Sequence, residues 1–412
     1  MDIIHGVDDR VLPRLAGDRV RAHLATMPAV VLTGARQTGK STLARSLVPS
    51  GRYATLDDLD VRALAERDPT ALVGGAGPII LDEVQRAPEL LHTVKRAIDE
   101  RRERGRYLLT GSANLLRLQR VSESLAVRAS YLTLWPMTRR EQRGEARCGR
   151  WDDLLAAPDE RWPDVLMDRP DEREDWRELA RRGGFPTPAL ELHDADERAI
   201  WFEAYANTYV ERDLQALSAI TSRTDFRRTM RAAALRLGHV LNQTDLARDV
   251  TVPQPTVHRW LNLLEASYLI VRLPAFATNR TKRLIKSPKL FWGDVGLALH
   301  LSGAAEPAGA HLENLVLHDL LAWRDARSGR AELHHWRTAD GREVDLVVEV
   351  GDDLLPVEIK STTRPRAGDT AGLRAFRTMH AGRARAGLLL HAGDRTEWLT
   401  SDVLAVPWWR VL

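Results

Sequence analysis

Short apolar runs alternate with helical patterns over the first third of the chain, from about residue 29 to residue 138. The apolar runs read AVVLTG, YATLDD, PIILDEV, RYLLTGS and ASYLTLWPM, and helical segments such as ARSLV and residues 89–104 stand between them. Such alternation is typical of a mostly parallel sheet that helices cover on both faces. The pattern predicts an α/β domain over residues 1–140.

The pattern becomes helical and more charged over residues 141–236. Its first part is rich in tryptophan and interrupted by proline, and residues 200–236 are strongly helical. We expect a helical linker or lid with exposed faces in this part of the chain.

Residues 237–285 follow the order of a winged helix. We expect a short helix over residues 245–249 with Thr244 as its N-cap, a turn, a second helix over residues 255–266, and then a strand. Trp260 falls on the apolar side of the second helix, which favours a place in the core over one that stacks on a base.

Residues 286–412 predict a second α/β module. After Pro307 come a helix and two strands, EVDLVVEV and LLPVEIK, which a GDD turn joins, and then another helix and strand. No internal repeat is apparent. The predicted fold class is therefore α/β, with a helical linker or lid and a winged helix between two α/β parts.

Composition narrows the class of protein. A chain of 412 residues suggests two to four domains, and no apolar stretch approaches the roughly 18 residues of a membrane span. We see no signal segment and expect a cytoplasmic protein without membrane contact. The single cysteine, Cys148, excludes an internal disulfide framework and a cysteine-based metal cluster. A net charge of +3 leaves room for a polyanionic partner without requiring one.

Lysine is scarce, and its positions suggest where chemistry occurs. Only six of the sixty basic residues are lysines: Lys40 lies in GARQTGKST, Lys360 in VEIK, and three more at Lys282, Lys286 and Lys289. An ammonium is a compact point charge, whereas a guanidinium is a planar fork. Chance remains the alternative, because Lys95 marks no recognisable motif.

The first motif is a phosphate-binding loop. GARQTGKST matches G-x-x-x-x-G-K-[ST] directly after an apolar strand and directly before a helix. In this context backbone N–H groups cradle the phosphates of ATP, Lys40 reaches the β- and γ-phosphates, and Ser41 binds Mg²⁺. The residues expected to contact the nucleotide and its ion are Gly34, Ala35, Arg36, Gln37, Thr38, Gly39, Lys40, Ser41, Thr42 and Asp82.

Two further strand ends complete the expected ATPase site. Asp82 in PIILDE would hold Mg²⁺, and Glu83 would orient the attacking water, although a paired Asp-Glu at a strand end can also be a helix N-cap. Thr110 and Ser112 in YLLTGS would sense the γ-phosphate, although Thr-Gly-Ser is also ordinary turn chemistry. Together the motifs indicate an ATPase of the additional-strand type.

A nucleic-acid contact is one of two interpretations of the winged-helix segment. Gln254, Thr256, His258 and Arg259 would lie at the start of a recognition helix. The basic loop TNRTKRLIKSPK would supply phosphate contacts. The alternative is that the segment serves packing or oligomerisation and that the basic loop is only a solvated face. The residues expected to contact phosphate are Arg280, Lys282, Arg283, Lys286 and Lys289.

The C-terminal strands carry the second constellation. Glu358 and Lys360 are two residues apart on one strand and share a face, and the short turn brings Asp345 close on the neighbouring strand. Two carboxylates and the Ile359 carbonyl would bind Mg²⁺ or Mn²⁺, Lys360 would activate water or stabilise charge on a phosphate, and Glu313 would complete the site. The alternative is a surface hairpin with an ordinary ion pair.

Taken together, GARQTGKST, IILDEVQ, LLTGS, YVERDL, LIKSPKLFWGDVGLA and the E…D…ExK tail resemble the AAA+-like ATP-binding proteins of bacteria and archaea with a C-terminal domain of unknown function. The resemblance implies an N-terminal AAA-type P-loop ATPase core, a winged helix in the middle, and a C-terminal restriction-endonuclease-like α/β module with a PD-(D/E)xK nuclease-like site. It assigns Walker roles to Lys40, Ser41, Asp82 and Glu83, and nuclease-like roles to Glu313, Asp345, Glu358 and Lys360.

One departure from the family concerns Arg128. The family has a Leu-Ala-Gly-Arg stretch after the sensor strand, whereas this chain has valine in the glycine position, at Val127. Arg128 is a candidate sensor arginine, acting in its own site or in that of a neighbouring subunit.

The leading hypothesis is an ATP-dependent enzyme that acts on DNA through a metal-dependent nuclease. A nucleotide-controlled DNA-binding switch with an inactive nuclease fold is the main alternative, and a purely protein-directed ATPase is the third. Homo-oligomerisation is compatible with each hypothesis. No small-molecule substrate other than ATP is expected.

Overall fold

The computed structural model describes residues 11–112, 125–168, 172–217, 222–279, 281, 283 and 286–412, with side chains in the third range described as far as residue 208. These residues form two compact units. Unit 1 comprises Met1–Leu134 and Arg140–Arg147, and unit 2 comprises Trp135–Arg139 and Cys148–Leu412.

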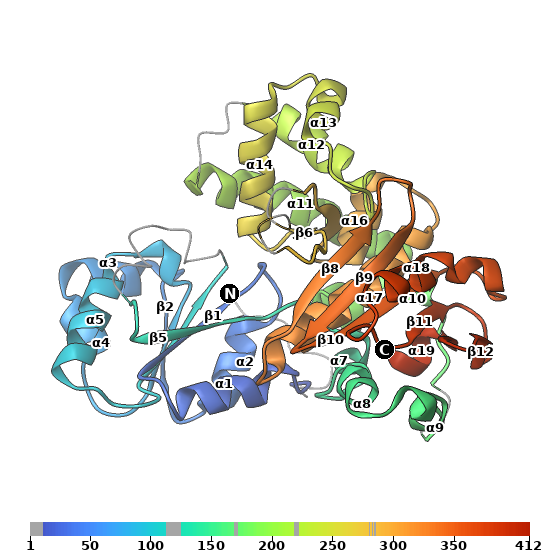
Figure 1. The fold of residues 1–412 in the computed structure, drawn as a ribbon. Coiled ribbons are helices and arrows are strands. Elements are labelled where there is room, and N and C mark those ends of the chain that lie inside the picture. The colour runs from blue at the N-terminus through green and yellow to red at the C-terminus, as the bar shows by residue number, and fades with distance from the viewer. Residues whose placement is uncertain are drawn as a thin grey trace. The chain divides into compact units, whose positions relative to one another are not determined.

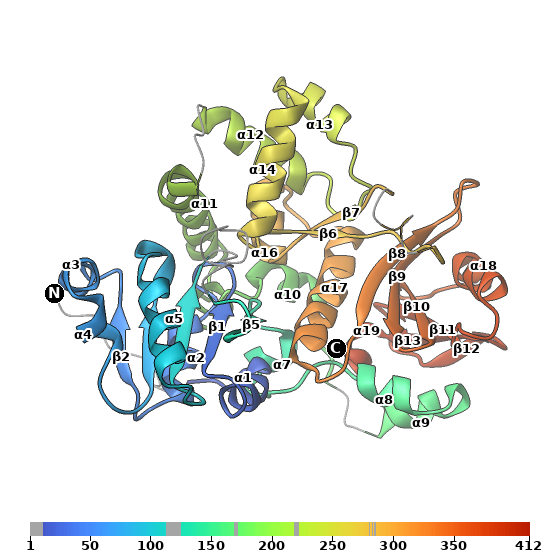
Figure 2. The same cartoon turned by 60° about the vertical axis from the view of Figure 1, so that its left-hand side comes forward.

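Unit 1 is built on a five-stranded parallel sheet with the order β2-β3-β4-β1-β5. Its strands β2, β1 and β5 are labelled in Figure 2. The P-loop follows β1, and Asp82 ends β3. Strand β4 lies between β1 and β3, which confirms the predicted additional strand. The strands are β1 (Ala29–Thr33), β2 (Arg52–Thr55), β3 (Ile79–Asp82), β4 (Tyr107–Gly111) and β5 (Ala129–Thr133).

Helices cover both faces of this sheet, because successive strand residues point to opposite sides. Val30 and Leu32 pack with residues of α1 and α2, whereas Ala29 and Val31 pack with residues of α3, α4 and α5. The helices of unit 1 are α1 (Ala16–Leu24), α2 (Lys40–Leu47), α3 (Leu59–Arg67), α4 (Pro69–Val73), the 3-10 helix η1 (Val84–Arg86) and α5 (Leu90–Glu100). Helix α7 (Arg139–Gln142) begins in unit 2 and continues in unit 1.

The tryptophan-rich segment after residue 148 is part of the core of unit 2. Trp151, Trp162 and Trp176 are buried, and the Trp151 Nε1 donates to Asp319 Oδ2 at 2.6 Å. The segment is helical and residues such as Asp152 and Asp153 are exposed, as expected, but the indoles pack inside a compact unit. The elements are α8 (Trp151–Ala156), η3 (Asp159–Arg161), α9 (Trp162–Met167), α10 (Trp176–Arg182) and the π-helix η4 (Thr187–Glu191).

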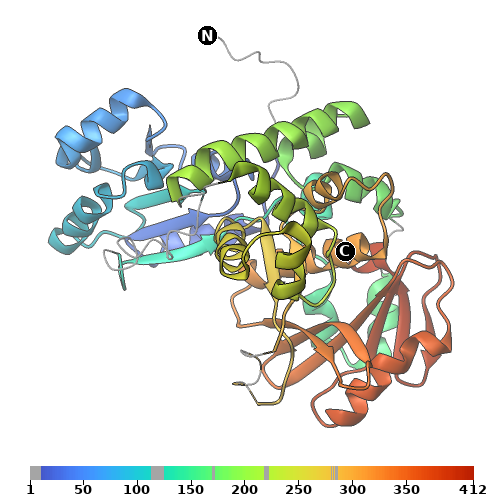
Figure 3. The same ribbon diagram turned by 90° about the horizontal axis from the view of Figure 1, so that it is seen from above.

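Next come four helices and a two-stranded antiparallel ribbon. The 23-residue helix α11 is seen along its length in Figure 3. Helices α12, α13 and α14 pack together (Figure 1). Residue Val240 bridges to Lys289 beside the ribbon. The elements are α11 (Ala195–Leu217), α12 (Arg223–Ala234), α13 (Gln243–Val250), α14 (Gln254–Ala266), β6 (Ile270–Leu273) and β7 (Lys289–Trp292).

Two expectations for this part need correction. Asn242, not Thr244, caps α13, since its side chain accepts from the backbone N–H groups of Thr244 and Asp245. The boundary expected between residues 285 and 286 separates β6 from its partner β7, so the ribbon spans it. Trp260 is buried in the core, as expected, with its ring edge-to-face on Phe226.

The rest of unit 2 is a six-stranded mixed sheet with the order β12-β13-β11-β10-β9-β8. β10, β11 and β13 are parallel to one another, and the remaining pairs are antiparallel. The strands are β8 (Glu332–Arg337), β9 (Glu343–Val350), β10 (Asp353–Lys360), β11 (Gly387–His391), β12 (Glu397–Thr400) and β13 (Val403–Pro407). The helices are α16 (Val295–Ser302), α17 (Gly309–Ala326), η5 (Ala367–Thr370), α18 (Ala371–Met379) and α19 (Trp408–Val411).

No helix in the described part of the chain is both long and apolar enough to cross a membrane.

Candidate functional site

The P-loop has the backbone that its glycines predict. Gly34 has φ +146°, and a Cβ there would lie 2.2 Å from the Leu134 carbonyl oxygen, so no other residue fits. Gly39 has φ +90° and begins α2 from the left-handed region, and Gln37 also has positive φ. The loop therefore wraps around the N-terminus of α2, where backbone N–H groups and the helix dipole favour an anion.

Lys40 is held inside this loop. Its Nζ donates to the carbonyl oxygens of Gly34 at 3.1 Å and of Ala35 at 2.7 Å, and the Thr38 hydroxyl also donates to Ala35 O at 3.0 Å. The Lys40 ammonium has three N–H donors. It can exchange one of these two carbonyl contacts for a contact with a phosphate oxygen and keep the other. Arg36 is half-buried and Thr42 is exposed at the same end of the sheet.

Asp82 gathers three hydroxyl groups from three elements. Ser41 Oγ donates to its Oδ1 at 2.8 Å, Tyr53 OH donates to its Oδ2 at 2.6 Å, and Thr110 Oγ1 also donates to Oδ1. Burial and this bond to Asp82 raise the pKa of Tyr53. Ser41 and Asp82 are hard oxygen donors in contact, as a Mg²⁺ site between a P-loop and a strand end requires.

Glu83 adopts a left-handed backbone, with φ 57° and ψ 45°. Its N–H donates to Thr110 Oγ1 at 3.2 Å, and its carboxylate accepts from Gln85 Nε2, which also donates to Ser112 Oγ at 2.8 Å. The side chain of Glu83 caps no helix N–H, so the N-cap alternative fails. The two strand ends expected to form the site, at Asp82–Glu83 and Thr110–Ser112, therefore meet.

Three residues of this site are not among those predicted from the sequence: Tyr53, Gln85 and Arg14. Gln85 lies in the quoted motif IILDEVQ, and Tyr53 starts an apolar run, so motif position could have drawn attention to both. Arg14 carries no local signal. Its Nη1 donates to the Thr38 carbonyl of the P-loop at 2.7 Å, and its Nε donates to Glu141 Oε1 at 3.0 Å.

The expectation that Arg128 senses nucleotide in its own site is wrong. β5 starts at Ala129, which pairs with Ala29 at the start of β1, whereas the P-loop follows the end of β1. Arg128 therefore lies at the opposite edge of the sheet, where it forms a bidentate ion pair with Asp99 of α5. A role in the site of a neighbouring subunit remains a prediction. Val127 has φ +65°, the conformation that suits the glycine of the family pattern.

In unit 2 the residues predicted to form the nuclease-like site converge. We call this group the acidic cluster; it consists of three carboxylates and one lysine, namely Glu313 of α17, Asp345 of β9, and Glu358 and Lys360 of β10. Asp345 and Glu358 are buried, which excludes an exposed hairpin, although Lys360 does form an ion pair with Glu358 at 2.6 Å. The Ile359 N–H donates to Asp345 Oδ2 at 3.0 Å. The expected role of the Ile359 carbonyl as a ligand remains a prediction.

A second lysine enters the acidic cluster from β7. Lys289 Nζ lies 3.0 Å from Asp345 Oδ1 and 3.9 Å from Glu313 Oε2, and the residue is buried. The expectation that Lys289 contacts nucleic-acid phosphate is therefore wrong, because its ammonium faces carboxylates inside the unit. Burial and the neighbouring Asp345 raise the pKa of Glu313 to about 8 and that of Glu358 to about 8.

Two carboxylate oxygens of the acidic cluster have no hydrogen-bond partner. They are Glu313 Oε2 and Glu358 Oε2, and both are buried. Buried polar atoms without partners are uncommon and call for an ion or water. The donor set, carboxylates near a lysine, fits Mg²⁺ or Mn²⁺ rather than a metal that prefers nitrogen or sulfur.

The described residues offer one tighter group of potential ligands, Glu332, His334 and Glu349, whose ligand atoms all lie within 4.8 Å of one another. A guanidinium already fills it. Arg283 Nη1 lies 3.2 Å from Glu332 Oε2, 3.2 Å from His334 Nε2 and 2.6 Å from Glu349 Oε2. This group is thus a buried ion-pair network, and the expectation of a phosphate contact at Arg283 is also wrong.

The remaining predicted nucleic-acid contacts differ in how exposed they are. Gln254, His258 and Arg259 are exposed at the start of α14, and Thr256 is half-buried. His258 Nδ1 lies 3.0 Å from Gln243 Oε1 of α13. Lys286 is exposed, whereas the predicted contacts Arg280 and Lys282 lie outside the described residues.

Two mycobacterial proteins align with nearly the whole chain. They are Uncharacterized protein Rv2008c of Mycobacterium tuberculosis and Uncharacterized protein Mb2031c of Mycobacterium bovis, each 31% identical over 405 residues, which is 96% of this chain and 83% of the relative. The chain belongs to the family of these proteins. Family membership covers both units, because the alignment runs through nearly all of the chain.

Three family profiles match successive parts of this family member. A AAA domain matches residues 26–142, and two domains of unknown function, DUF8612 and DUF4143, match residues 173–308 and 308–411. The Walker-type ATPase PABY2304 of Pyrococcus abyssi is similar at 16% identity and a TM-score of 0.44, over 71% of this chain and 99% of that chain. The P-loop and Asp82 lie inside the AAA match, so unit 1 carries a P-loop ATPase domain of the AAA type.

Proposed function

We propose that this protein hydrolyses ATP in unit 1 and that the nucleotide state controls a metal-dependent nuclease-like site in unit 2 that acts on nucleic acid. The two halves of the proposal rest on separate observations. The first half is supported by the AAA domain and by the three hydroxyl groups that converge on Asp82. The second half rests on the acidic cluster.

In the ATPase half, each residue has a role that its position supports. Lys40 and the P-loop N–H groups would bind the phosphates, and Ser41 and Asp82 would hold Mg²⁺. Glu83 would orient the attacking water and accept its proton, while Thr110 would hold both Asp82 and the Glu83 backbone in place. Because Gln85 joins Glu83 to Ser112, it would set the direction of the Glu83 carboxylate.

In the nuclease-like half, Glu313, Asp345 and Glu358 would hold Mg²⁺ or Mn²⁺. When bound, such an ion supplies Lewis-acid chemistry at a phosphodiester. Lys360 has a partly exposed ammonium beside Glu358, so it can stabilise charge on an incoming phosphate. The observation that carries this half is the pair of buried carboxylate oxygens without hydrogen-bond partners, beside a D…ExK arrangement on adjacent strands.

The nucleic-acid class of the substrate is supported by elements around the ribbon. The order α12, the Val240 bridge, α13, α14 and the β6–β7 ribbon is that of a winged helix, with polar residues exposed at the start of α14. Such a helix start is what a recognition helix presents to DNA. The burial of Arg283 and Lys289 removes two expected phosphate contacts, so DNA binding would rest on fewer cations.

The test is a matched set of activities on the full chain. ATP turnover should be lost in Lys40→Ala and Glu83→Gln, with ATP binding retained in Glu83→Gln, while Lys95→Ala, a lysine on α5, serves as the control. Cleavage of single- and double-stranded DNA and RNA with Mg²⁺ or Mn²⁺ should be lost in Lys360→Ala. If the wild type cleaves none of these substrates, the nuclease half is wrong and the ATPase half stands.

A second candidate function has a specific observation in its favour. Lys289 already neutralises Asp345, so the acidic cluster can persist as a structural feature in a nucleotide-controlled nucleic-acid-binding switch. ATP turnover and salt-dependent DNA binding without cleavage would select this function. A sedimentation measurement with and without ATP would show whether the protein forms homo-oligomers, which a role for Arg128 in a neighbouring subunit requires.

A further inference from the structure

Three loops at one end of the strands of the mixed sheet line a pocket that has no part in the proposed catalysis. Its volume is about 390 Å³, and its residues include Ser361 and Thr363 after β10, Asp394 after β11, and Trp408 and Trp409 after β13. Since β10, β11 and β13 are parallel, these loops all follow carboxyl ends of strands. In open α/β sheets ligands bind at this edge. We call it the strand-end pocket.

The loops of the strand-end pocket are fixed to one another. The Ala392 N–H donates to the Thr362 carbonyl at 2.9 Å, and a side chain at Gly393 would come within 2.1 Å of the Thr363 carbonyl oxygen. The C-terminal helix α19 is held by Arg139, whose Nη1 donates to the Leu412 carbonyl at 2.7 Å. The pocket is therefore preformed rather than dependent on a ligand for its shape.

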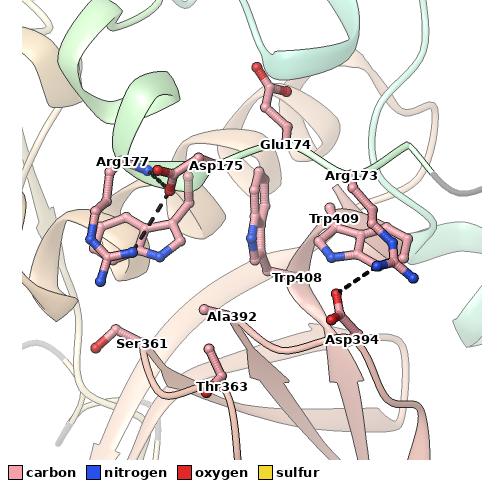
Figure 4. A pocket seen from close by; sticks show the side chains of 11 residues that line it. Arg173, Glu174, Asp175, Arg177, Ser361, Thr363, Ala392, Asp394, Trp408 and Trp409 are labelled. Atoms are coloured by element: carbon pink, nitrogen blue, oxygen red, sulfur yellow. Dashed lines mark hydrogen bonds and ion pairs between the residues drawn. The ribbon is translucent and has the colours of Figure 1, made fainter.

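Two arginines stacked on tryptophans flank the pocket (Figure 4). The Arg173 guanidinium lies 5.6 Å from the Trp409 ring centroid, and that of Arg177 lies 4.6 Å from the Trp176 ring centroid, with Trp408 between the two pairs. Stacking on an indole holds a guanidinium in place. The Arg173 guanidinium is also paired with the Asp394 carboxylate at 3.3 Å, which the dashed line in Figure 4 marks. A planar N–H fork of this kind matches the oxygens of a phosphate ester.

The acidic residues of the pocket have basic partners, and that of Asp394 is Arg173. Glu174 accepts from Arg139 and Arg182 and points away from Ser361 and Thr363 in Figure 4. Asp175 accepts the Arg177 backbone N–H at 3.0 Å as the N-cap of α10, and its carboxylate lies 3.8 Å from the Arg177 guanidinium. Arg177 is thus only loosely paired, and it can turn to a ligand at small cost.

The strand-end pocket adjoins the acidic cluster. Ser361 directly follows Lys360, so their Cα atoms are about 3.8 Å apart. Gly309, at the start of the helix that carries Glu313, approaches Ser361 closely, since a Cβ there would lie 3.3 Å from the Ser361 hydroxyl. A ligand in the pocket would therefore lie next to any phosphodiester bound at Lys360.

We propose that the strand-end pocket holds one nucleotide of a single polynucleotide strand, with its phosphate on Arg177 and its neighbouring phosphodiester at the acidic cluster. The volume lies in the range of pockets that hold one small ligand and is too small for a duplex. This inference rests on the proposed nucleic-acid function and names the part of the substrate that the site recognises beyond the cleaved bond.

The experiment measures binding of a fluorescent single-stranded 12-mer to the full chain that carries Lys40→Ala, so that the P-loop does not compete for phosphate. Adding Arg177→Ala should weaken binding about tenfold. It should also make the negative slope of log K against log salt shallower by about 0.7, as expected for one lost phosphate contact on a single strand. Arg161→Ala, an exposed arginine that pairs with Asp164, is the matched control and should change neither quantity. Equal melting temperatures of all variants show that the fold is intact.

The outcomes separate this inference from the proposed function. If the strand binds and Arg177→Ala binds it equally well, the pocket is not a nucleotide site, and the nucleic-acid function stands. If deoxyadenosine monophosphate competes as well as the unlabelled 12-mer, the pocket takes a free nucleotide and the strand proposal is wrong. If the wild type binds neither DNA nor RNA strands, both proposals are wrong.

Discussion

The guanidinium of Arg14 donates to the carboxylate of Glu141 at 3.0 Å, and both side chains are buried. The same carboxylate oxygen accepts the Leu15 N–H at 2.7 Å, and Arg14 also donates to the Thr38 carbonyl of the P-loop. Glu141 therefore holds an arginine that supports the P-loop from outside. The phosphate-binding loop depends on a residue more than a hundred positions further along the chain.

Replacing Glu141 by alanine should weaken ATP binding. The change leaves Arg14 buried without its carboxylate, and loss of one partner of a buried pair typically costs about 3–5 kcal/mol. We expect a raised KM for ATP and a lower melting temperature, measured by ATP turnover and calorimetry. Glu141→Gln keeps an acceptor and should show a smaller effect. Arg21→Ala, which removes an exposed ion pair with Asp18, should show neither effect.

Replacing Gln85 by alanine should slow ATP hydrolysis without weakening ATP binding. Gln85 connects Glu83 to Ser112, and a misplaced catalytic group can cost on the order of a hundredfold in rate. We expect kcat to fall by about ten- to a hundredfold with KM nearly unchanged. Ser112→Ala should give a smaller fall in kcat. A rise in kcat would instead mean that Gln85 restrains Glu83.

Lys289→Met should lower the melting temperature and make it depend on divalent metal. The change keeps the length of the side chain but leaves Asp345 and Glu313 without their ammonium, at a cost of about 3–5 kcal/mol. Mg²⁺ or Mn²⁺ should restore the melting temperature of the variant more than it raises that of the wild type. Lys286→Met, at an exposed lysine just before β7, is the control. Equal metal responses would contradict a metal site at the acidic cluster.

His335 should make unit 2 less stable as the pH falls. Burial, and next the positive charge of Lys289, lower the pKa of His335 from 6.5 to about 4. Because the unfolded chain binds the proton more readily, the stabilising effect of neutral His335 is fully present above pH 6.5 and is lost between pH 6.5 and 4, by about 3 kcal/mol. The measurement is the melting temperature against pH. His335→Gln should lose this part of the slope.

Val127→Gly should stabilise unit 1. Val127 has φ +65° and its residue is 84% exposed, so glycine removes the strain of a β-branched residue in the left-handed region and gives up little buried surface. Part of this gain is offset by the greater freedom of glycine in the unfolded chain. We expect a gain of about 1 kcal/mol in the free energy of unfolding, measured in urea. Val127→Ala should gain less, and an unchanged stability in Val127→Gly would show that the loop is not strained.

The parts that could be predicted from the sequence are those in which neighbours along the chain decide the structure. The P-loop is set by an apolar strand, glycines and a helix that follow one another between Ala29 and Leu47. Glu358 and Lys360 share a face because strand periodicity places them there. β9 and β10 meet across a short turn, so Asp345 and Glu358 could be paired with no knowledge of the rest of the fold.

The parts that could not be predicted depend on distant partners. Lys289 and Arg283 lie in a basic segment that looks like a solvated surface, and their carboxylates, Asp345 and Glu349, come 56 and 66 residues later. The charge of a side chain is visible in the sequence, whereas its partner is not. The burial of the tryptophans in residues 148–182 could not be predicted for a similar reason. Charged residues surround them in the sequence, so the apolar face that they form is not apparent there.

The order in which the chain visits its two units has a practical consequence. Residues 135–139 belong to unit 2, residues 140–147 return to unit 1, and the chain re-enters unit 2 at Cys148. A fragment that stops at the end of β5 lacks Glu141, and one that starts at the AAA match lacks Arg14. A fragment from residue 11 to residue 147 keeps both but also carries a piece of the other unit. The smallest independent version of the nucleotide unit is therefore not one uninterrupted stretch of sequence.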